Sequence, residues 1–198
     1  MNLILASASG VRKQILDKYN IKTDVIVSNV DEDQIKEAFL MEKISPLNIS
    51  KNLAEIKSIK VSNKYPDRLV LGADSVISLN DKLINKPKSR EEALEILKKL
   101  NNSKHFLISS VCISKNGSMI WNHSDKSELK MKNLRIEELK KYLNKIKTDT
   151  LLKYGVYQIE SDGLELFEYV NGDKDSIMGL PIKQIIDYIN QYKSWKKN

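Results

Sequence analysis

Short apolar runs alternate with amphipathic stretches along most of the chain. Residues 3–6, 24–28 and 68–71 consist mainly of apolar side chains, which is typical of short buried strands. A second kind of segment repeats apolar positions every three or four residues, which predicts helices with one buried face. These segments are 11–19, 45–64, 89–102, 135–146 and a last one that begins at Pro181. Strands and helices therefore mix throughout, and we expect an α/β or α+β protein with a mixed sheet.

Cap and turn signals indicate where several elements begin and end. Ser45 precedes Pro46, an N-cap followed by proline at the first helical position, and Tyr65-Pro66 should stop that helix. Ser89 with Glu92 three residues later is a capping box. Turn residues at 80–81 and 115–117 separate apolar runs, so they predict a hairpin within 76–84 and a strand pair formed by 106–113 and 118–129. Residues 164–170 also resemble a strand.

The length of 198 residues suits a single domain with a real core, and we find neither a repeat nor a linker. No apolar run approaches the ~20 residues of a membrane span, and the first residues do not resemble a secretory leader. Cys112 is the single cysteine and cannot form an internal disulfide. With only two histidines beside it, a Cys/His zinc site is nearly excluded. We expect a cytoplasmic protein without a membrane partner.

The net charge of +7 raises the question of nucleic-acid binding. Of the 33 basic residues nearly all are lysine, and aromatic residues do not interleave with them as in RNA-recognition motifs. A solvated lysine-rich surface explains the charge better, so we expect no stable nucleic-acid complex. A nucleic-acid-binding protein stays as an alternative, and it would bind with a steep salt dependence.

Two segments combine small residues with charge. Ser7-Ala8-Ser9-Gly10 stands between a strand and a helix, followed by Arg12 and Lys13, and free N–H groups at a helix start can bind an anion. The alternative is a simple N-cap with two surface cations. Gly72-Ala73-Asp74-Ser75 ends the most apolar predicted strand, where Asp74 could hold Mg²⁺ or accept a proton from water. The alternative is a turn aspartate that bonds its own backbone.

Three further segments could carry chemistry. Lys86, beside a proline, could place a charge on a phosphoryl group, although it could equally be one more exposed lysine. Residues 155–160 mix small, aromatic and acidic side chains, which suits base recognition in a loop, or a glycine-bounded strand. Asp31-Glu32, in an acidic loop, could add metal ligands, but an acidic helix start explains them as well.

In combination these segments resemble the Maf-like nucleoside triphosphate pyrophosphatase family. The matching segments are 5–13 (LASASGVRK), 30–32 (VDE), 53–57 (LAEIK), 72–75 (GADS) with Lys86-Pro87, 99–101 (KLN), 155–160 (GVYQIE) and 178–181 (MGLP). The match spans nearly the whole chain, in the same order and spacing, and is therefore specific.

The resemblance implies a fold, an activity and an assembly. The fold would be α/β, an elongated twisted mixed sheet with flanking helices and two lobes around a cleft, as in inosine triphosphate pyrophosphatases, formed by residues 1–198 as a single Maf-like domain. The enzyme would hydrolyse a nucleoside triphosphate to monophosphate and pyrophosphate with Mg²⁺ or Mn²⁺, with a homodimer as a possible assembly. A regulatory module that binds nucleotides without turnover is the alternative.

The resemblance also assigns roles to individual residues. Asp74, Lys86 and Glu32 would be catalytic, and Asp74 and Glu32 would hold the metal. The substrate-binding residues would be Ser7, Ser9, Arg12, Lys13, Lys57, Ser75 and Glu160. Three of these depart from the family pattern: Lys13 replaces an arginine, Ser75 a threonine, and Glu160 the glutamine of the branch that acts on dTTP and UTP. The preferred base therefore does not carry over.

Overall fold

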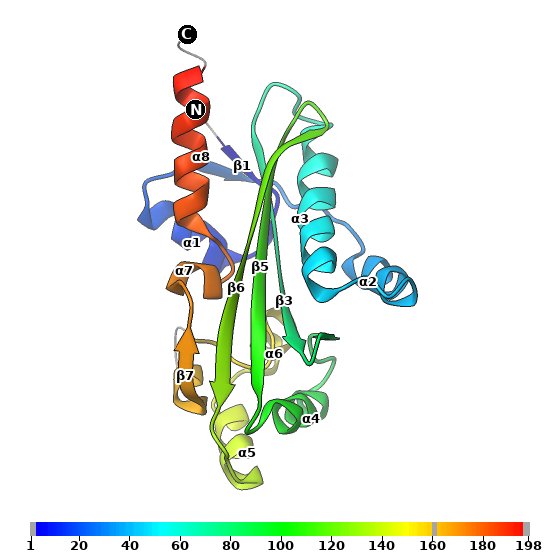
Figure 1. Cartoon of the computed structure of the whole chain (residues 1–198), viewed down its shortest axis with the longest axis vertical. Coiled ribbons are helices and arrows are strands. Elements are labelled where there is room, and N and C mark those ends of the chain that lie inside the picture. Colours follow the sequence, from blue (N-terminus) through cyan, green and yellow to red (C-terminus); the bar gives the residue numbers. More distant parts are fainter. Residues whose placement is uncertain (1–2, 160–161, 196–198) are drawn as a thin grey trace. The chain divides into compact units, whose positions relative to one another are not determined.

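The computed structural model describes residues 3–159 and 162–195, which form a mixed α/β arrangement (Figure 1). The sheet has seven strands in the order β2-β1-β3-β5-β6-β7, and β4 pairs with β3. The strands are β1 (Leu3–Leu5), β2 (Thr23–Val25), β3 (Val70–Leu79), β4 (Lys82–Ile84), β5 (Lys104–Lys115), β6 (Ser118–Met131) and β7 (Phe167–Asn171). The predicted mixed sheet with flanking helices is confirmed.

The described helices are α1 (Gly10–Lys18), α2 (Glu32–Met41), α3 (Pro46–Ser62), α4 (Arg90–Leu100), α5 (Ile136–Asn144), α6 (Thr148–Tyr154), α7 (Lys174–Ile177) and α8 (Ile182–Trp195), with a 3₁₀ turn η1 at Asp162–Leu166. Among them, none is both long and apolar enough to cross a bilayer. The side chains of Ser45 and Ser89 cap α3 and α4 by accepting from the backbone N–H three residues on, as predicted.

The chain divides into two compact units. The first consists of Met1–Ser75, Ile108–Asp125 and Asp173–Asn198, and the second of Val76–Leu107 and Lys126–Gly172. Strands β3, β5 and β6 contribute residues to both units.

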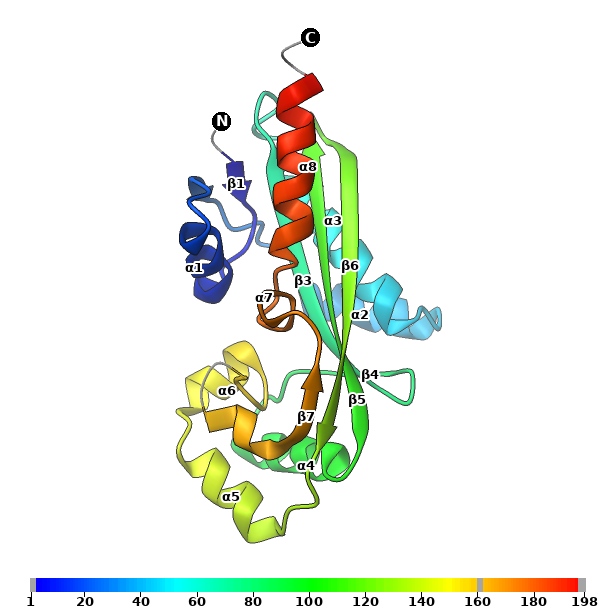
Figure 2. The same cartoon turned by 60° about the vertical axis from the view of Figure 1, so that its left-hand side comes forward.

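In the first unit, helices cover both faces of the sheet, which explains why all residues of β1 are apolar. Leu3 and Leu5 belong to a core with α1 and α8, whereas Ile4 and Ala6 belong to a core with Val61 of α3. Because successive strand residues point to opposite faces, every residue of a doubly covered strand is buried. Figure 2 shows α1 and α8 on one side of these strands and α3 on the other.

Parallel pairing of β1 with both β2 and β3 determines which residues meet. Leu5 pairs with Leu71, so the segments that follow, from Ser7 and from Ala73, run side by side. The sequence predicted that the apolar strand would end at residues 72–75; this is wrong, because β3 continues to Leu79. The strand tolerates the polar Asp74 because that side chain finds partners within the fold.

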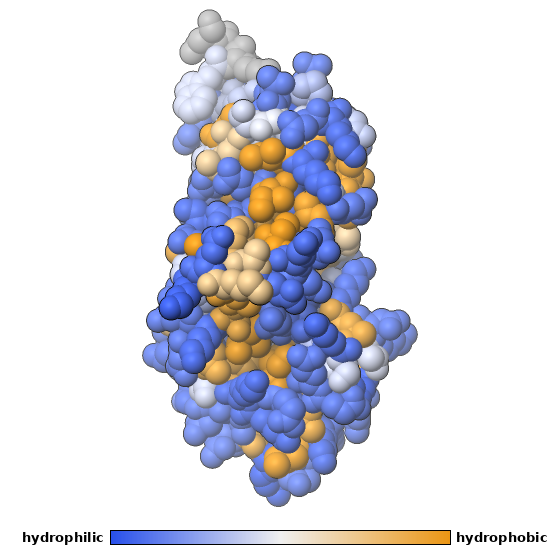
Figure 3. Space-filling model, turned by 90° about the vertical axis from the view of Figure 1, so that its right-hand side faces the viewer, coloured by the Kyte–Doolittle hydropathy of each residue, from blue (hydrophilic) through white to orange (hydrophobic). Residues whose placement is uncertain are grey.

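Helix α2 replaces the expected acidic loop, so the alternative of an acidic helix start is confirmed. Asp31 caps it by accepting from Gln34 N–H, and Glu32 and Asp33 lie in its first turn, where carboxylates are stabilised. None of its residues is buried, and Met41 is 83% exposed. Figure 3 shows the surface on the side where α2 lies in Figure 1, and there apolar residues are mixed with hydrophilic ones. The apolar pattern of α2 is short, with Ile35 and Phe39 half-buried one turn apart.

In the second unit, α4, α5, β6 and β7 pack around a separate apolar core. His105 is fully buried there, with its Nε2 3.0 Å from the hydroxyl of Tyr157 and its ring tilted against Phe167. Segment 155–159 is not the glycine-bounded strand that was the alternative interpretation. It is an irregular turn in which Gln158 donates from Nε2 to the Gly155 carbonyl.

Candidate active site

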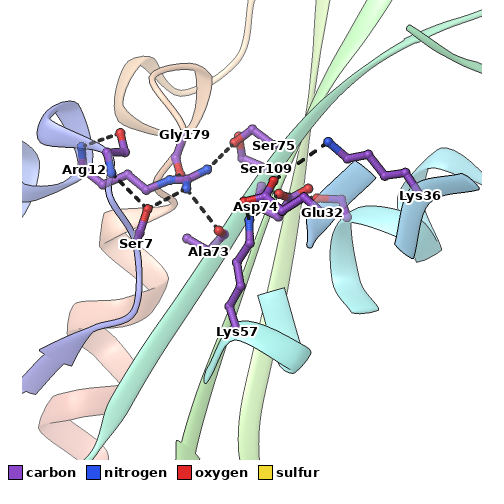
Figure 4. Close-up of polar contacts among 12 residues, drawn as sticks. Ser7, Arg12, Glu32, Lys36, Lys57, Ala73, Asp74, Ser75, Ser109 and Gly179 are labelled. Atoms are coloured by element: carbon purple, nitrogen blue, oxygen red, sulfur yellow. Dashed lines mark hydrogen bonds and ion pairs between the residues drawn. The ribbon is translucent and has the colours of Figure 1, made fainter. Parts of the chain in front are cut away.

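A lysine joins two carboxylates in the first unit, at the contact between α3 and β3 (Figure 4). Lys57 Nζ lies 2.8 Å from Asp74 Oδ1 and 2.8 Å from Glu32 Oε1. Lys57 is 4% exposed and Asp74 3%. A buried ammonium is tolerated when carboxylates compensate it, and the second carboxylate comes from the first turn of α2. The alternative of a turn aspartate bonded to its own backbone is therefore wrong for Asp74.

The close approach of α3 to β3 depends on Gly72. A Cβ atom there would lie 2.1 Å from the Ala54 carbonyl oxygen and 2.8 Å from Ser58 N. Both are backbone atoms, which cannot rotate away as a side chain could. The absent side chain thus lets Lys57 reach Asp74, two residues further along the strand.

We predict that Gly72→Ala separates α3 from β3. Overpacking of this kind costs about 1–3 kcal/mol, and the displacement also weakens the Lys57–Asp74 pair. Thermal unfolding should show a lower melting temperature, together with a loss of activity larger than the unfolded fraction explains. Gly10→Ala is a matched control, because a Cβ there meets no atom within 4 Å. Equal stability of the two variants would contradict this role of Gly72.

Arg12 joins three segments of the first unit. Its Nε donates to the Gly179 carbonyl at 2.9 Å, Nη1 to Ser7 Oγ and the Ala73 carbonyl at 3.0 Å each, and Nη2 to Ser75 Oγ at 3.1 Å. Burial lowers the pKa of Arg12, while the charges of Asp74 and Glu32 act in the opposite direction. Within the described structure, four of its five N–H groups are used by the protein. The fifth N–H has no hydrogen-bond partner among the described residues.

Ser109 is a member of this cluster that the sequence analysis missed. It is buried on β5, and its Oγ lies 2.9 Å from Ser75 Oγ, which in turn accepts from Arg12. The hydroxyls of Ser109 and Ser75 therefore hold the guanidinium from the sheet side. The signal that could have found Ser109 is a pair of serines inside an otherwise apolar strand.

The other predicted residues of the N-terminal turn differ in their contacts, and not all of them join the cluster. Ser9 caps α1 by accepting from Arg12 N–H, so the N-cap interpretation is confirmed. Ser7 reaches Arg12, as described above. The structure does not bring Lys13 into the cluster, because its ammonium pairs with Asp17 one turn further along α1. For Lys13 the alternative of a surface cation fits the described contacts.

Two predicted residues do not belong to the first unit. Lys86 lies exposed after β4, in the second unit. Glu160 lies outside the described residues, although the preceding segment is held in place by the contacts of Tyr157 and Gln158.

The acidic pair fits a divalent metal ion. The second oxygen of Asp74, Oδ2, is buried and has no hydrogen-bond partner among the described residues. An orphaned carboxylate oxygen is costly unless a ligand completes it. No group of three His, Cys, Asp or Glu side chains gathers within the described part of the chain. Two carboxylates nevertheless suffice for Mg²⁺, which usually combines one or two of them with substrate phosphates and water.

Comparison with known proteins shows the family of this chain. The family model described as Maf-like protein matches residues 2–192. The chain belongs to the Maf-like family. A protein of Pelagibacter ubique named nucleoside triphosphate pyrophosphatase is 57% identical over 96% of this chain and 98% of its own length. One of the same name from Ruegeria pomeroyi is 34% identical over 94% of each chain.

Among solved structures, a HAM1 protein from Coxiella burnetii covers 68% of this chain and 74% of its own, with a TM-score of 0.43 and 13% identity.

Proposed function

We propose that this Maf-like protein hydrolyses a nucleoside triphosphate to the monophosphate and pyrophosphate. The observation that carries the proposal is the Asp74–Lys57–Glu32 cluster beside Arg12, in a chain closely related to proteins named for this activity. A regulatory module without turnover is not favoured, because the similar proteins from Pelagibacter ubique and Ruegeria pomeroyi are both named for turnover.

In the proposed reaction, water attacks the α-phosphorus and the bond to the bridging oxygen of pyrophosphate breaks. Asp74 has one oxygen fixed by Lys57, and its free Oδ2 would bind the metal or take the proton of the attacking water. A Mg²⁺ or Mn²⁺ ion held by Asp74 and Glu32 would neutralise charge on phosphate oxygens. Lys57 and the remaining N–H of Arg12 would stabilise the negative charge that develops on the leaving group.

The remaining family residues complete this proposal. Ser9 and nearby backbone N–H groups would bind a terminal phosphate, and Ser7 and Ser75 would hold Arg12 for it. A role for Lys86 as a phosphate contact rests on the family pattern alone. A place for Lys13 rests on the family pattern alone, since its described partner is Asp17.

The proposal is tested by pyrophosphate release from a panel of standard and modified nucleoside triphosphates, with Mg²⁺ or Mn²⁺ added. We expect release from at least one nucleotide, dependent on the metal. Tight nucleotide binding without any release would instead indicate the regulatory module.

We predict that Glu160 selects the base. An ionised Glu only accepts hydrogen bonds and should favour guanine or cytosine, whereas Gln also donates and can complement uracil or thymine. Glu160→Gln should therefore shift the ratio of catalytic efficiencies towards UTP and dTTP by about tenfold, since an unmatched polar contact costs roughly 1–3 kcal/mol. The efficiencies for GTP, CTP, UTP and dTTP are measured in parent and variant. An unchanged ratio would exclude Glu160 from the base site.

We also propose that both units act as one Maf-like domain in the cytoplasm, where nucleoside triphosphates are made and used. The family match, which runs through residues of both units, supports a single functional domain. We propose no stable nucleic-acid complex, and a homodimer as a possible assembly that light scattering would reveal.

A further inference from the structure

A lysine that none of the family motifs includes points at the acidic pair. Lys36 lies one turn after Glu32 on α2, and its Nζ is 3.9 Å from Glu32 Oε2. In Figure 4 its side chain extends from α2 towards Glu32 and Asp74. Only 11% of the Lys36 side chain is exposed, on a helix that has no buried residue. By contrast, Lys98 of α4, which also pairs within its own helix, is 38% exposed.

The pairing of Lys36 is the loosest in the cluster. Lys57 is held at 2.8 Å by both carboxylates, whereas Lys36 approaches only Glu32, and at the outer limit of an ion pair. At 3.9 Å the Lys36 ammonium and Glu32 Oε2 are beyond hydrogen-bond distance, so the ammonium gives up no hydrogen bond to Glu32 when it changes partner. Among the described residues the N–H donors of Lys36 have no hydrogen-bond acceptor, and they can serve an incoming anion.

The charge of the cluster favours such an anion. Arg12, Lys36 and Lys57 oppose Glu32 and Asp74, so the described cluster carries a net positive charge. A bound divalent metal would add to it. Arg12 and Lys57 are largely engaged by other groups of the protein. Of the three cations in the cluster, Lys36 is therefore the one that is held most weakly.

We infer that Lys36 is a further substrate-contacting residue, which transfers its ammonium from Glu32 to a phosphate oxygen when the triphosphate binds. The inference rests on the proposed function and extends it to α2, which thereby contributes both a carboxylate and a phosphate-binding cation. Because Lys36 would bind a substrate oxygen already before the reaction, its removal should affect binding more than turnover.

The test compares Lys36→Met, Lys36→Arg and the matched control Lys98→Met. Calorimetry measures the dissociation constant of inorganic tripolyphosphate in the presence of Mg²⁺, and steady-state assays measure KM and kcat for the best nucleotide. We expect Lys36→Met to weaken tripolyphosphate binding and raise KM about tenfold, the effect of one charge-assisted hydrogen bond. Lys36→Arg and Lys98→Met should stay within about twofold of the parent, since the first keeps a charge and the second lies in the other unit.

Several results would overturn the inference. The first is that Lys36→Met binds tripolyphosphate within twofold of the parent. The second is that Lys36→Met loses kcat alone, which would mean that Lys36 merely orients Glu32. The third is that the parent itself does not bind tripolyphosphate. Failure of the proposed function is a separate result, seen as absence of pyrophosphate release by the parent for every nucleotide. Because calorimetry needs no turnover, it judges Lys36 in that case too.

Discussion

Asp74→Asn is expected to lower turnover by at least ~100-fold, the usual contribution of a general base. The amide keeps the shape of the side chain but removes the charge that a metal ion or a proton requires. It also replaces the buried Oδ2, which has no hydrogen-bond partner among the described residues, with a group that no longer attracts a cation. The measurement is kcat for pyrophosphate release at saturating nucleotide and metal.

The fold should survive this substitution. Lys57 would lose one carboxylate but keep Glu32 at 2.8 Å, so its ammonium is not left uncompensated in the interior. Circular dichroism should therefore match the parent. Asp187→Asn on α8 is the control, an exposed aspartate replaced in the same way. Turnover within a few-fold of the parent in Asp74→Asn would assign the chemistry to another group.

His105 should make the second unit sensitive to acid. Burial lowers the pKa of His105 from 6.5 to about 4. Between these values the unfolded chain binds a proton that the folded chain does not, so the free energy of unfolding falls as the pH falls from 6.5 to 4. Over this window the loss attributable to His105 is about 3 kcal/mol, at 1.36 kcal/mol per pKa unit.

This effect is measured as the difference between parent and His105→Gln in denaturant unfolding at several pH values. Glutamine can still hydrogen-bond the Tyr157 hydroxyl but does not titrate, so its stability should depend less steeply on pH in this range. Nuclear magnetic resonance gives an independent measurement, the titration of the His105 ring in the folded protein. A midpoint near 6.5 would refute the prediction even if the variant proved unstable.

Local signals in the sequence sufficed for many elements of the fold. The caps at Ser45 and Ser89 act within a few residues, and so their helices were predicted with nearly correct starts. The turn before Gly117 likewise separated β5 from β6 as expected. Helix α2 has only the short apolar pattern of Ile35 and Phe39, and the four-residue α7 is too short for any, so the pattern indicated neither.

The candidate site was predictable in residue type but not in geometry. Asp74 stands out as an acid that directly follows an apolar run, and this can be recognised from neighbouring residues alone, whereas its place inside β3 could not. Its partner Lys57 is one of many lysines, and family resemblance singled it out where composition could not. Lys13, chosen by the same resemblance, pairs with Asp17 instead, because an oppositely charged residue one helical turn away is its nearest partner.

By itself, the sequence determined that this is a protein of mixed strands and helices, of the Maf-like family, with an acid where its most apolar predicted strand ends. Only the tertiary structure decided which groups surround that acid. Ser109 and the Gly179 carbonyl come from two separate segments, and each reaches the site through long-range contacts that no local pattern encodes. The approach of Lys57 to Asp74 likewise depends on the packing of α3 against Gly72, and that of Arg12 to the Ala73 carbonyl on the parallel register of β1 and β3, which are long-range properties of the folded chain.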